Sequence, residues 1–211
     1  MQIDIERELS EGYAVQRNVI LEDVLSLASR VDVMPSTDGR YAVVQDGPER
    51  NSLDASWHQD GLTYLKPPSR VLLYCEAVGR GDVTTDLADV PTALEQIDPD
   101  TRETLNRLDR YYVSRSGKDT HHGRLIRNDE EKGMDYFSLC SRGWVRGDLD
   151  MTLERMTRAM HALFEAFQPS LVHKWSAGDC LIFDNLRFVH RRFNPTNTPD
   201  PARRLIRLWF A

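Results

Sequence analysis

The sequence has few cysteines and no long apolar run, and both shortages exclude whole classes of protein. Only Cys75, Cys140 and Cys180 occur among 211 residues, an odd number at wide spacing. Disulfide frameworks and zinc knuckles need cysteines in sets at short intervals, so we interpret these three as buried thiols. No apolar stretch approaches the roughly 20 residues of a membrane span. Residues 1–6 also lack the basic and apolar segments of a signal peptide. These features predict a cytoplasmic protein without a membrane segment.

Positive charge is also scarce. The chain has 27 Lys and Arg against 33 Asp and Glu, a formal net charge of −6. Binding to nucleic acid depends on clustered cations, and no basic stripe with interleaved aromatic residues occurs. The G-x-S-x-G turn of nucleophilic hydrolases is absent too. We therefore expect a small-molecule substrate and no nucleic-acid partner.

The length fits one domain over residues 1–211, because no repeat, low-complexity tract or linker divides the chain. The hydrophobic patterning predicts many short strands and few helices, which is typical of a β-sandwich or jelly-roll barrel. Strands are expected at 13–20, 70–77, 111–115, 136–140, 171–175, 180–183 and 203–210, and helices at 21–31, 91–97, 100–108 and 150–167. Residues 34–55 are interpreted as strand fragments and a loop. The polar segment 116–133 is expected to be a solvated loop, with a mobile lid as the alternative.

The stretch Trp57-His58-Gln59-Asp60-Gly61 carries the most specific chemistry in the chain. Residues two apart on a strand point to the same face, so His58 and Asp60 can bind one metal ion. A third ligand must come from elsewhere, and His190 follows the apolar run 181–189. Two imidazoles and one carboxylate form the ligand set of non-haem Fe(II) oxygenases, which leaves three positions open. We therefore predict an Fe(II) site at His58, Asp60 and His190.

The expected strand 203–210 carries three arginines. By strand alternation, Arg203, Leu205 and Arg207 share one face and Arg204 points the other way. The open positions of the predicted metal site suit a bidentate 2-oxo acid and O2. A 2-oxo diacid also needs a cation at its far carboxylate, which a guanidinium binds through two hydrogen bonds. This strand supplies that cation.

Further motifs follow the first in a fixed order. They are Gly81 with Thr85-Asp86-Leu87-Ala88-Asp89, then Trp175-Ser176-Ala177-Gly178-Asp179, then Asp184-Asn185 through His190, and finally Arg203 with Arg207. From about residue 55 to the C-terminus, this order resembles the taurine dioxygenase-like (TauD/TfdA) branch of the Fe(II)/2-oxoglutarate oxygenases. Several motifs in the right order are much more specific than one.

The resemblance implies a fold and a role for each motif. The fold would be mainly β with flanking helices, a double-stranded β-helix (jelly-roll, cupin-like). His58, Asp60 and His190 would form the catalytic Fe(II) site. Thr85 and Arg203 would hold the 2-oxoglutarate carboxylate, with Thr84 as a substitute for Thr85 because the gap from Gly81 is longer than in the family pattern. Arg207 resembles the family's second arginine, which binds an anionic substrate group or the co-substrate.

The implied reaction consumes 2-oxoglutarate and O2 and releases succinate and CO2. It would oxidise, and most simply hydroxylate, a C–H bond of a small anionic or zwitterionic substrate such as an amino acid or a natural-product intermediate. With Asp60 present, no ligand position is left for chloride, which argues against halogenation. Desaturation or ring formation depends on the substrate's pose.

Two other functions stay open at this point. A metal-holding jelly roll can bind or sense a small acid without oxidising it. Related enzymes also hydroxylate or demethylate proteins, although an acidic, compact chain argues against a peptide substrate. A second metal site at His121, His122 and His173 has no cysteine or carboxylate spacing to support it.

Overall fold

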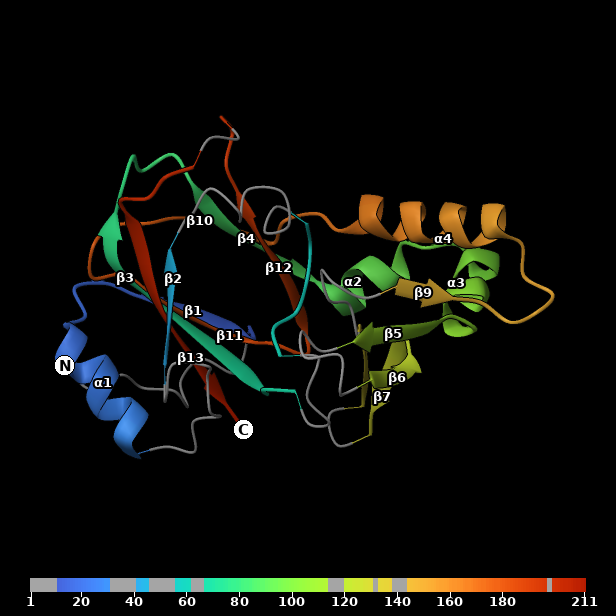
Figure 1. Ribbon diagram of the computed structural model, residues 1–211, viewed down its shortest axis with the longest axis horizontal. Coiled ribbons are helices and arrows are strands. Elements are labelled where there is room, and N and C mark those ends of the chain that lie inside the picture. Colours follow the sequence, from blue (N-terminus) through green and yellow to red (C-terminus); the bar gives the residue numbers. More distant parts are fainter. Residues whose placement is uncertain are drawn as a thin grey trace.

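The computed structural model describes residues 11–30, 41–45, 56–61, 67–113, 120–130, 133–137, 144–196 and 199–211 (Figure 1). Its largest element is an antiparallel five-stranded sheet, the major sheet. In spatial order its strands are β1 (Tyr13–Gln16), β11 (Cys180–Asp184), β3 (Arg70–Val78), β13 (Arg203–Phe210) and β2 (Ala42–Gln45). The apolar run of β3 is continuous because this central strand is buried on both faces.

A second antiparallel sheet, the minor sheet, has three strands. Its order is β10 (Leu171–Lys174), β4 (Thr84–Asp89) and β12 (Phe188–Phe193). The free edge of β12 is extended by an isolated bridge between His58 and His190. The segment around His58 therefore lies against the minor sheet like a short fourth strand.

The remaining elements flank the two sheets. Helix α1 (Leu21–Arg30) lies beside the major sheet, and a lobe on the right of Figure 1 holds the other helices. This lobe contains α2 (Val90–Glu95), α3 (Pro99–Asn106), α4 (Leu153–Ala166), β5 (Asp109–Val113), β6 (Thr120–Arg124), β7 (Ile126–Asp129), β8 (Met134–Phe137) and β9 (Trp144–Arg146). Its strands pair as β6-β5-β9 and as β7-β8.

Three apolar clusters hold these layers together. One lies between the two sheets and joins Leu73 and Leu205 of the major sheet to Leu87 and Phe188 of the minor sheet. A second packs α1 on the outer face of the major sheet. The third joins the outer face of the minor sheet to the helices of the lobe. The two sheets thus form a sandwich whose interior is lined by alternate residues of each strand.

The predicted mainly β architecture with flanking helices is confirmed, and each of the four predicted helices is present within a few residues. Strand alternation along β13 is confirmed as well, because Leu205 packs in the interior cluster while Arg204 is ion-paired to Glu76 outside it. The buried thiols are confirmed for Cys75 and Cys180. Cys140 lies outside the described residues.

Two predictions are wrong in part. Residues 120–129 of the expected loop form strands β6 and β7, because Leu125 and Ile126 anchor them in the cluster beneath the lobe. The rest of segment 116–133 includes residues outside the described part of the chain, so the lid alternative stays a prediction. The helical spacing of the apolar residues along α4 predicts one buried stripe of Leu153, Met156, Met160, Leu163, Phe164 and Phe167, but Leu153 and Phe164 are exposed, so the buried stripe is narrower. No helix in the described part of the chain is long and apolar enough to cross a membrane.

Candidate metal centre

His58 and His190 are placed by the bridge at the edge of the minor sheet. The His58 N–H donates to the His190 carbonyl at 2.9 Å, and the His190 N–H donates to the His58 carbonyl at 2.8 Å. Directly opposed residues of an antiparallel pair point to the same face. The two imidazoles therefore lie side by side, with ring centroids 4.3 Å apart.

Asp60 is held by Asn185, which lies in the turn between β11 and β12. The Asn185 amide accepts from the Asp60 N–H at 2.9 Å and donates to the Asp60 carbonyl at 3.0 Å. It also donates to the Pro68 carbonyl at 2.9 Å. Asp184 closes the turn itself by accepting the N–H groups of Leu186 and Arg187. A fully buried amide in the β11–β12 connection thus fixes the backbone of the segment that carries Asp60.

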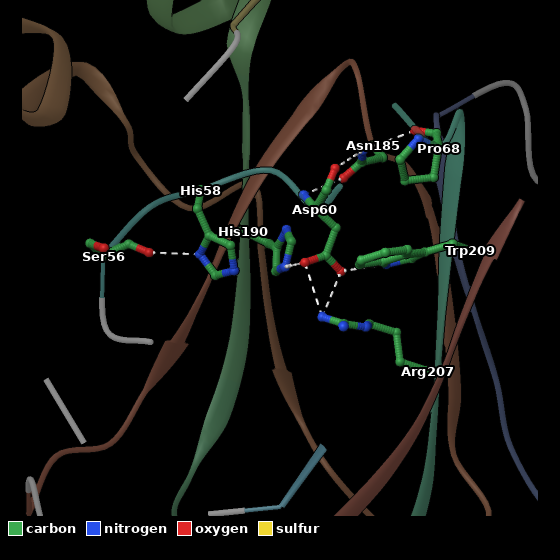
Figure 2. A network of polar contacts seen from close by, with 8 residues as sticks. All are labelled: Ser56, His58, Asp60, Pro68, Asn185, His190, Arg207 and Trp209. Atoms are coloured by element: carbon green, nitrogen blue, oxygen red, sulfur yellow. Dashed lines mark hydrogen bonds and ion pairs between the residues drawn. The ribbon is translucent and has the colours of Figure 1, made fainter. Parts of the chain in front are cut away.

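The side chains of His58, Asp60 and His190 converge (Figure 2). One ligand atom from each lies within 4.8 Å of the other two, and this is the one such group among the residues that the structure describes. His58 Nδ1 lies 2.9 Å from the Ser56 carbonyl, a contact that leaves its Nε2 for a metal. His190 Nε2 lies 3.9 Å from Asp60 Oδ1. The alternative second metal site at His121, His122 and His173 stays untested, because the His121 side chain lies outside the described part of the chain.

The electrostatics of the site keep its groups in the forms that bind metals. Burial alone would raise the pKa of Asp60, but the Arg207 guanidinium, the two imidazoles and the Trp209 N–H lower it to about 2. Burial, and next the neighbouring His58, lower the pKa of His190 to about 3. At neutral pH the site therefore presents a carboxylate and a neutral imidazole, and neither must lose a proton to bind a cation.

Two residues of β13 meet the Asp60 carboxylate. Arg207 Nη1 lies 3.1 Å from Oδ1 and 3.2 Å from Oδ2, and Trp209 Nε1 donates to Oδ2 at 2.9 Å. Figure 2 shows both side chains reaching this carboxylate. The structure thus brings Arg207, predicted from the sequence to bind a co-substrate or substrate anion, directly beside Asp60, a predicted metal ligand.

The other predicted co-substrate residues lie further along the same interior. Thr85 is buried, and its hydroxyl accepts from Trp175 Nε1 at 3.0 Å. The Arg203 guanidinium carbon lies 6.0 Å from the centre of the Trp175 ring. Trp175 therefore connects Thr85 of the minor sheet to Arg203 of the major sheet.

Thr84 points away from this interior. Its hydroxyl donates to Asp86 Oδ1 at 2.7 Å, on the face of β4 opposite Leu87 and Thr85. Because the Thr85 oxygen accepts from Trp175, its own hydroxyl proton can be donated to a carboxylate. The geometry favours Thr85 over Thr84 as a co-substrate residue.

In the turn Ser176-Ala177-Gly178-Asp179, the glycine and the aspartate have structural roles. Gly178 has φ +83°, and its N–H donates to the Cys75 carbonyl at 2.9 Å. Asp179 Oδ2 accepts from the Ser176 N–H at 2.9 Å, while its carbonyl accepts from Cys75 N–H. The turn is bonded to Cys75 of β3 through Gly178 and Asp179, and this attachment helps to fix where Trp175 lies.

Sequence reasoning missed Trp209, and it considered His173 only for a second metal site. The same alternation that singled out Arg207 also places Trp209 on the inner face of β13, and this signal was present in the sequence. His173 is buried directly opposite Thr85 in the β10–β4 register and meets the Trp175 ring edge-on at 4.4 Å. Its place beside Thr85 depends on a strand register that no local pattern shows.

A sequence profile described as "Taurine catabolism dioxygenase TauD, TfdA family" matches residues 21–209. The chain belongs to the TauD/TfdA family. This family consists of Fe(II)/2-oxoglutarate-dependent dioxygenases, so the predicted enzyme class and cofactors are confirmed at that level. A donor set of two imidazoles and one carboxylate at this spacing fits Fe(II).

Solved structures support the same fold for this TauD/TfdA-family chain. PvcB, an Fe, alpha-ketoglutarate-dependent oxygenase from an isonitrile synthetic pathway, has a TM-score of 0.75 at 19% identity and covers 95% of this chain and 76% of its own. A taurine dioxygenase from Burkholderia xenovorans has a TM-score of 0.74 at 15% identity, over 94% of this chain and 76% of its own. An asparagine oxygenase in complex with Fe(II), 3-hydroxyasparagine and succinate has a TM-score of 0.69 at 15% identity, over 95% and 74%.

These structural matches confirm the predicted double-stranded β-helix. Among curated proteins, no sequence matches this TauD/TfdA-family chain.

Proposed function

We propose that the protein hydroxylates a C–H bond of a small anionic or zwitterionic molecule, using Fe(II), 2-oxoglutarate and O2. The observation that carries this proposal is the convergence of His58, Asp60 and His190 within 4.8 Å in a TauD/TfdA-family chain. When bound, Fe(II) supplies the oxidising chemistry. One oxygen atom of O2 enters the substrate C–H bond and the other enters succinate, while the first carbon of 2-oxoglutarate leaves as CO2.

His58, Asp60 and His190 bind the metal on one side and leave the other side to the two substrates. Their protonation states suit this role, because Asp60 stays ionised and His190 stays neutral. The two hydrogen bonds between the Asn185 amide and the Asp60 backbone keep that backbone in place. Rigid support of this kind is what holds ligands in productive geometry.

Thr85 and Arg203 hold the far carboxylate of 2-oxoglutarate. Both line the interior between the sheets, and both are at least nine-tenths buried, so a carboxylate there is shielded from water. A charge-assisted bond from a buried guanidinium is stronger than one in water. The Thr85 hydroxyl adds a second donor, oriented by Trp175.

Arg207 serves the anionic end of the co-substrate or substrate nearest the metal. Its Nη1 is engaged by Asp60, while its Nε is buried and makes no hydrogen bond within the described part of the chain. A buried guanidinium N–H is costly to leave without an acceptor. A carboxylate beside the metal, from the co-substrate or from an acidic or zwitterionic substrate, supplies that acceptor.

The substrate class draws further support from two solved relatives. One acts in an isonitrile synthetic pathway and another is an asparagine oxygenase. An amino acid or a natural-product intermediate is therefore the class to screen first. We also propose a cytoplasmic location, supported by the buried thiol of Cys75, which forms no disulfide within the described part of the chain.

The test is succinate formation from 2-oxoglutarate under air with added Fe(II), comparing wild type with His190→Ala. Turnover that disappears in the variant establishes the cofactor chemistry, and amino acids and other small acids are then screened for increased succinate. If both proteins are silent without substrate, anaerobic binding of Fe(II) and 2-oxoglutarate is measured directly. Failure of the wild type to bind either one contradicts the proposal, and binding with no turnover on any acid instead supports a sensor.

A further inference from the structure

We propose that Trp209 is a positioning residue for the metal centre, whose indole N–H selects which oxygen of Asp60 binds the metal. The inference rests on the proposed function, since it assigns a role within the same site. It concerns a residue two positions beyond Arg207 on β13, outside the motifs that identify the family.

The two carboxylate oxygens of Asp60 have different surroundings. Oδ1 lies 3.9 Å from His190 Nε2, on the side where the imidazoles converge. Oδ2 accepts the Trp209 Nε1–H at 2.9 Å. A lone pair engaged by a directional N–H is less available to a metal, so Trp209 leaves Oδ1 as the ligand.

Arg207 cannot make this distinction. Its Nη1 lies 3.1 Å from Oδ1 and 3.2 Å from Oδ2, so it supports both oxygens almost equally. Its charge stabilises the ionised form of Asp60 without choosing a side. Among the hydrogen bonds that this carboxylate accepts within the described part of the chain, the one from Trp209 favours a single oxygen.

The Trp209 ring is itself held in place. The Arg207 guanidinium carbon lies 4.4 Å from the centre of the ring, and the ring packs against the apolar cluster between the sheets. Residues 207 and 209 share a face because they are two apart on a strand. Trp209 therefore reaches Asp60 from the major sheet, whereas both histidine ligands come from the minor sheet side.

Loss of the indole N–H frees Oδ2 and lets the carboxylate rotate or bind through both oxygens. Hydrogen-bond partners of metal ligands typically contribute 10- to 100-fold in metal affinity. We expect Trp209→Phe to weaken Co(II) and Fe(II) binding by about tenfold or more. The visible absorption spectrum of the Co(II)-loaded protein should change too, because it reports the number and geometry of the ligands.

The experiment titrates metal-free protein with Co(II), and with Fe(II) under nitrogen, and follows affinity and the Co(II) spectrum without any turnover. Trp209→Phe keeps an aromatic ring against Arg207 and removes the N–H. If that variant does not fold, the benzothienyl analogue of tryptophan at position 209 replaces the N–H by sulfur with nearly the same shape. Phe210→Leu is the matched control, because Phe210 is buried on the other face of β13.

The expected result is weaker binding and an altered spectrum for the two position-209 variants, with wild-type affinity and spectrum for Phe210→Leu. Position-209 variants within twofold of wild type, with an unchanged spectrum, overturn the inference while leaving the proposed function intact. A loss of affinity in Phe210→Leu equal to that in Trp209→Phe also overturns it, since general disturbance of β13 would then be the cause. Wild type that binds neither metal contradicts the proposed function itself.

Discussion

The adjacent threonines that begin β4 offer a direct comparison of two hydroxyls. Thr85 faces the interior with Trp175, and Thr84 faces Asp86 on the opposite side. We expect Thr85→Val to weaken 2-oxoglutarate binding to the metal-loaded protein by roughly tenfold, the effect of one lost hydrogen bond to a charged group. Metal affinity should stay unchanged. Anaerobic titration of the Fe(II)-loaded protein with 2-oxoglutarate measures both steps.

Thr84→Val is the matched control, because it removes a hydroxyl of equal size from the same strand. It should lower stability by about 1 kcal/mol through the lost bond to buried Asp86, with 2-oxoglutarate affinity near wild type. The reverse pattern, with 2-oxoglutarate binding impaired in Thr84→Val and normal in Thr85→Val, would show that Thr84 binds the co-substrate instead.

Acidification should destabilise the protein partly through His173. Burial lowers the pKa of this imidazole below its ordinary 6.5, with Asp179 acting in the opposite direction. Below about pH 6.5 the unfolded chain therefore takes up a proton that the folded protein resists, so stability falls as the pH falls. Urea unfolding of metal-free protein at pH 7.5 and 5.5 should show a smaller loss for His173→Phe than for wild type. Equal losses in the two proteins would contradict this role.

At the scale of residues, the sequence predicts which candidate metal ligands converge, because strand alternation and residue type suffice to pair His58 with Asp60. The partners of those ligands are harder to predict. Asn185 meets Asp60 across 125 positions of sequence, and Trp209 meets it across 149. Such bonds depend on how two sheets are aligned, and no local pattern contains that information.

At the scale of elements, α4 shows what periodicity can and cannot predict. The 3.6-residue spacing places the helix correctly, and Thr152 caps it by accepting the Arg155 N–H. Which of its apolar side chains are buried depends on the elements packed against the helix, and Leu153 at the start of the helix is 74% exposed. For segment 120–129 the error is the opposite one. Its charged residues predict a loop, but it forms strands β6 and β7, which Leu125 and Ile126 anchor.

The packing of α4 can be tested at a single position. Leu163 is fully buried among α3, α4 and the outer face of the minor sheet, so Leu163→Ala should cost about 2–5 kcal/mol of unfolding free energy. Leu153→Ala on the same helix removes the same atoms from a side chain that is 74% exposed, and should change stability by no more than about 0.5 kcal/mol. Urea unfolding measures both. Similar costs for the two variants would contradict the described packing.

At the scale of the whole molecule, the two-sheet sandwich keeps its thiols from solvent. Burial raises the pKa of Cys75 to about 11 from an ordinary 9.0, so the reactive thiolate is roughly a hundredfold scarcer at pH 8. In a Cys140→Ser background, an aromatic disulfide reagent should therefore label neither Cys75 nor Cys180 until denaturant is added. Rapid labelling of two thiols in the native protein would show that the sandwich opens readily.

The sandwich also shows the limit of what the sequence predicts for the molecule as a whole. Strand-rich patterning and the order of motifs indicate the architecture, since most of the motifs fall on strands or on the turns that join them. The spatial order β1-β11-β3-β13-β2 cannot be predicted from such patterns, because strands that are neighbours in the sheet lie far apart in the sequence. The pairing of Tyr13 with Phe183 is one such contact that only folding itself determines.

The position of β13 has a consequence for the order of folding. This strand lies between β3 and β2 near the middle of the major sheet, and it carries Arg207 and Trp209 to the Asp60 carboxylate. Until β13 pairs with β3, one edge of β3 is open and Asp60 lacks both of these partners. A folding intermediate without β13 in place therefore exposes an unpaired sheet edge, a state prone to wrong pairing.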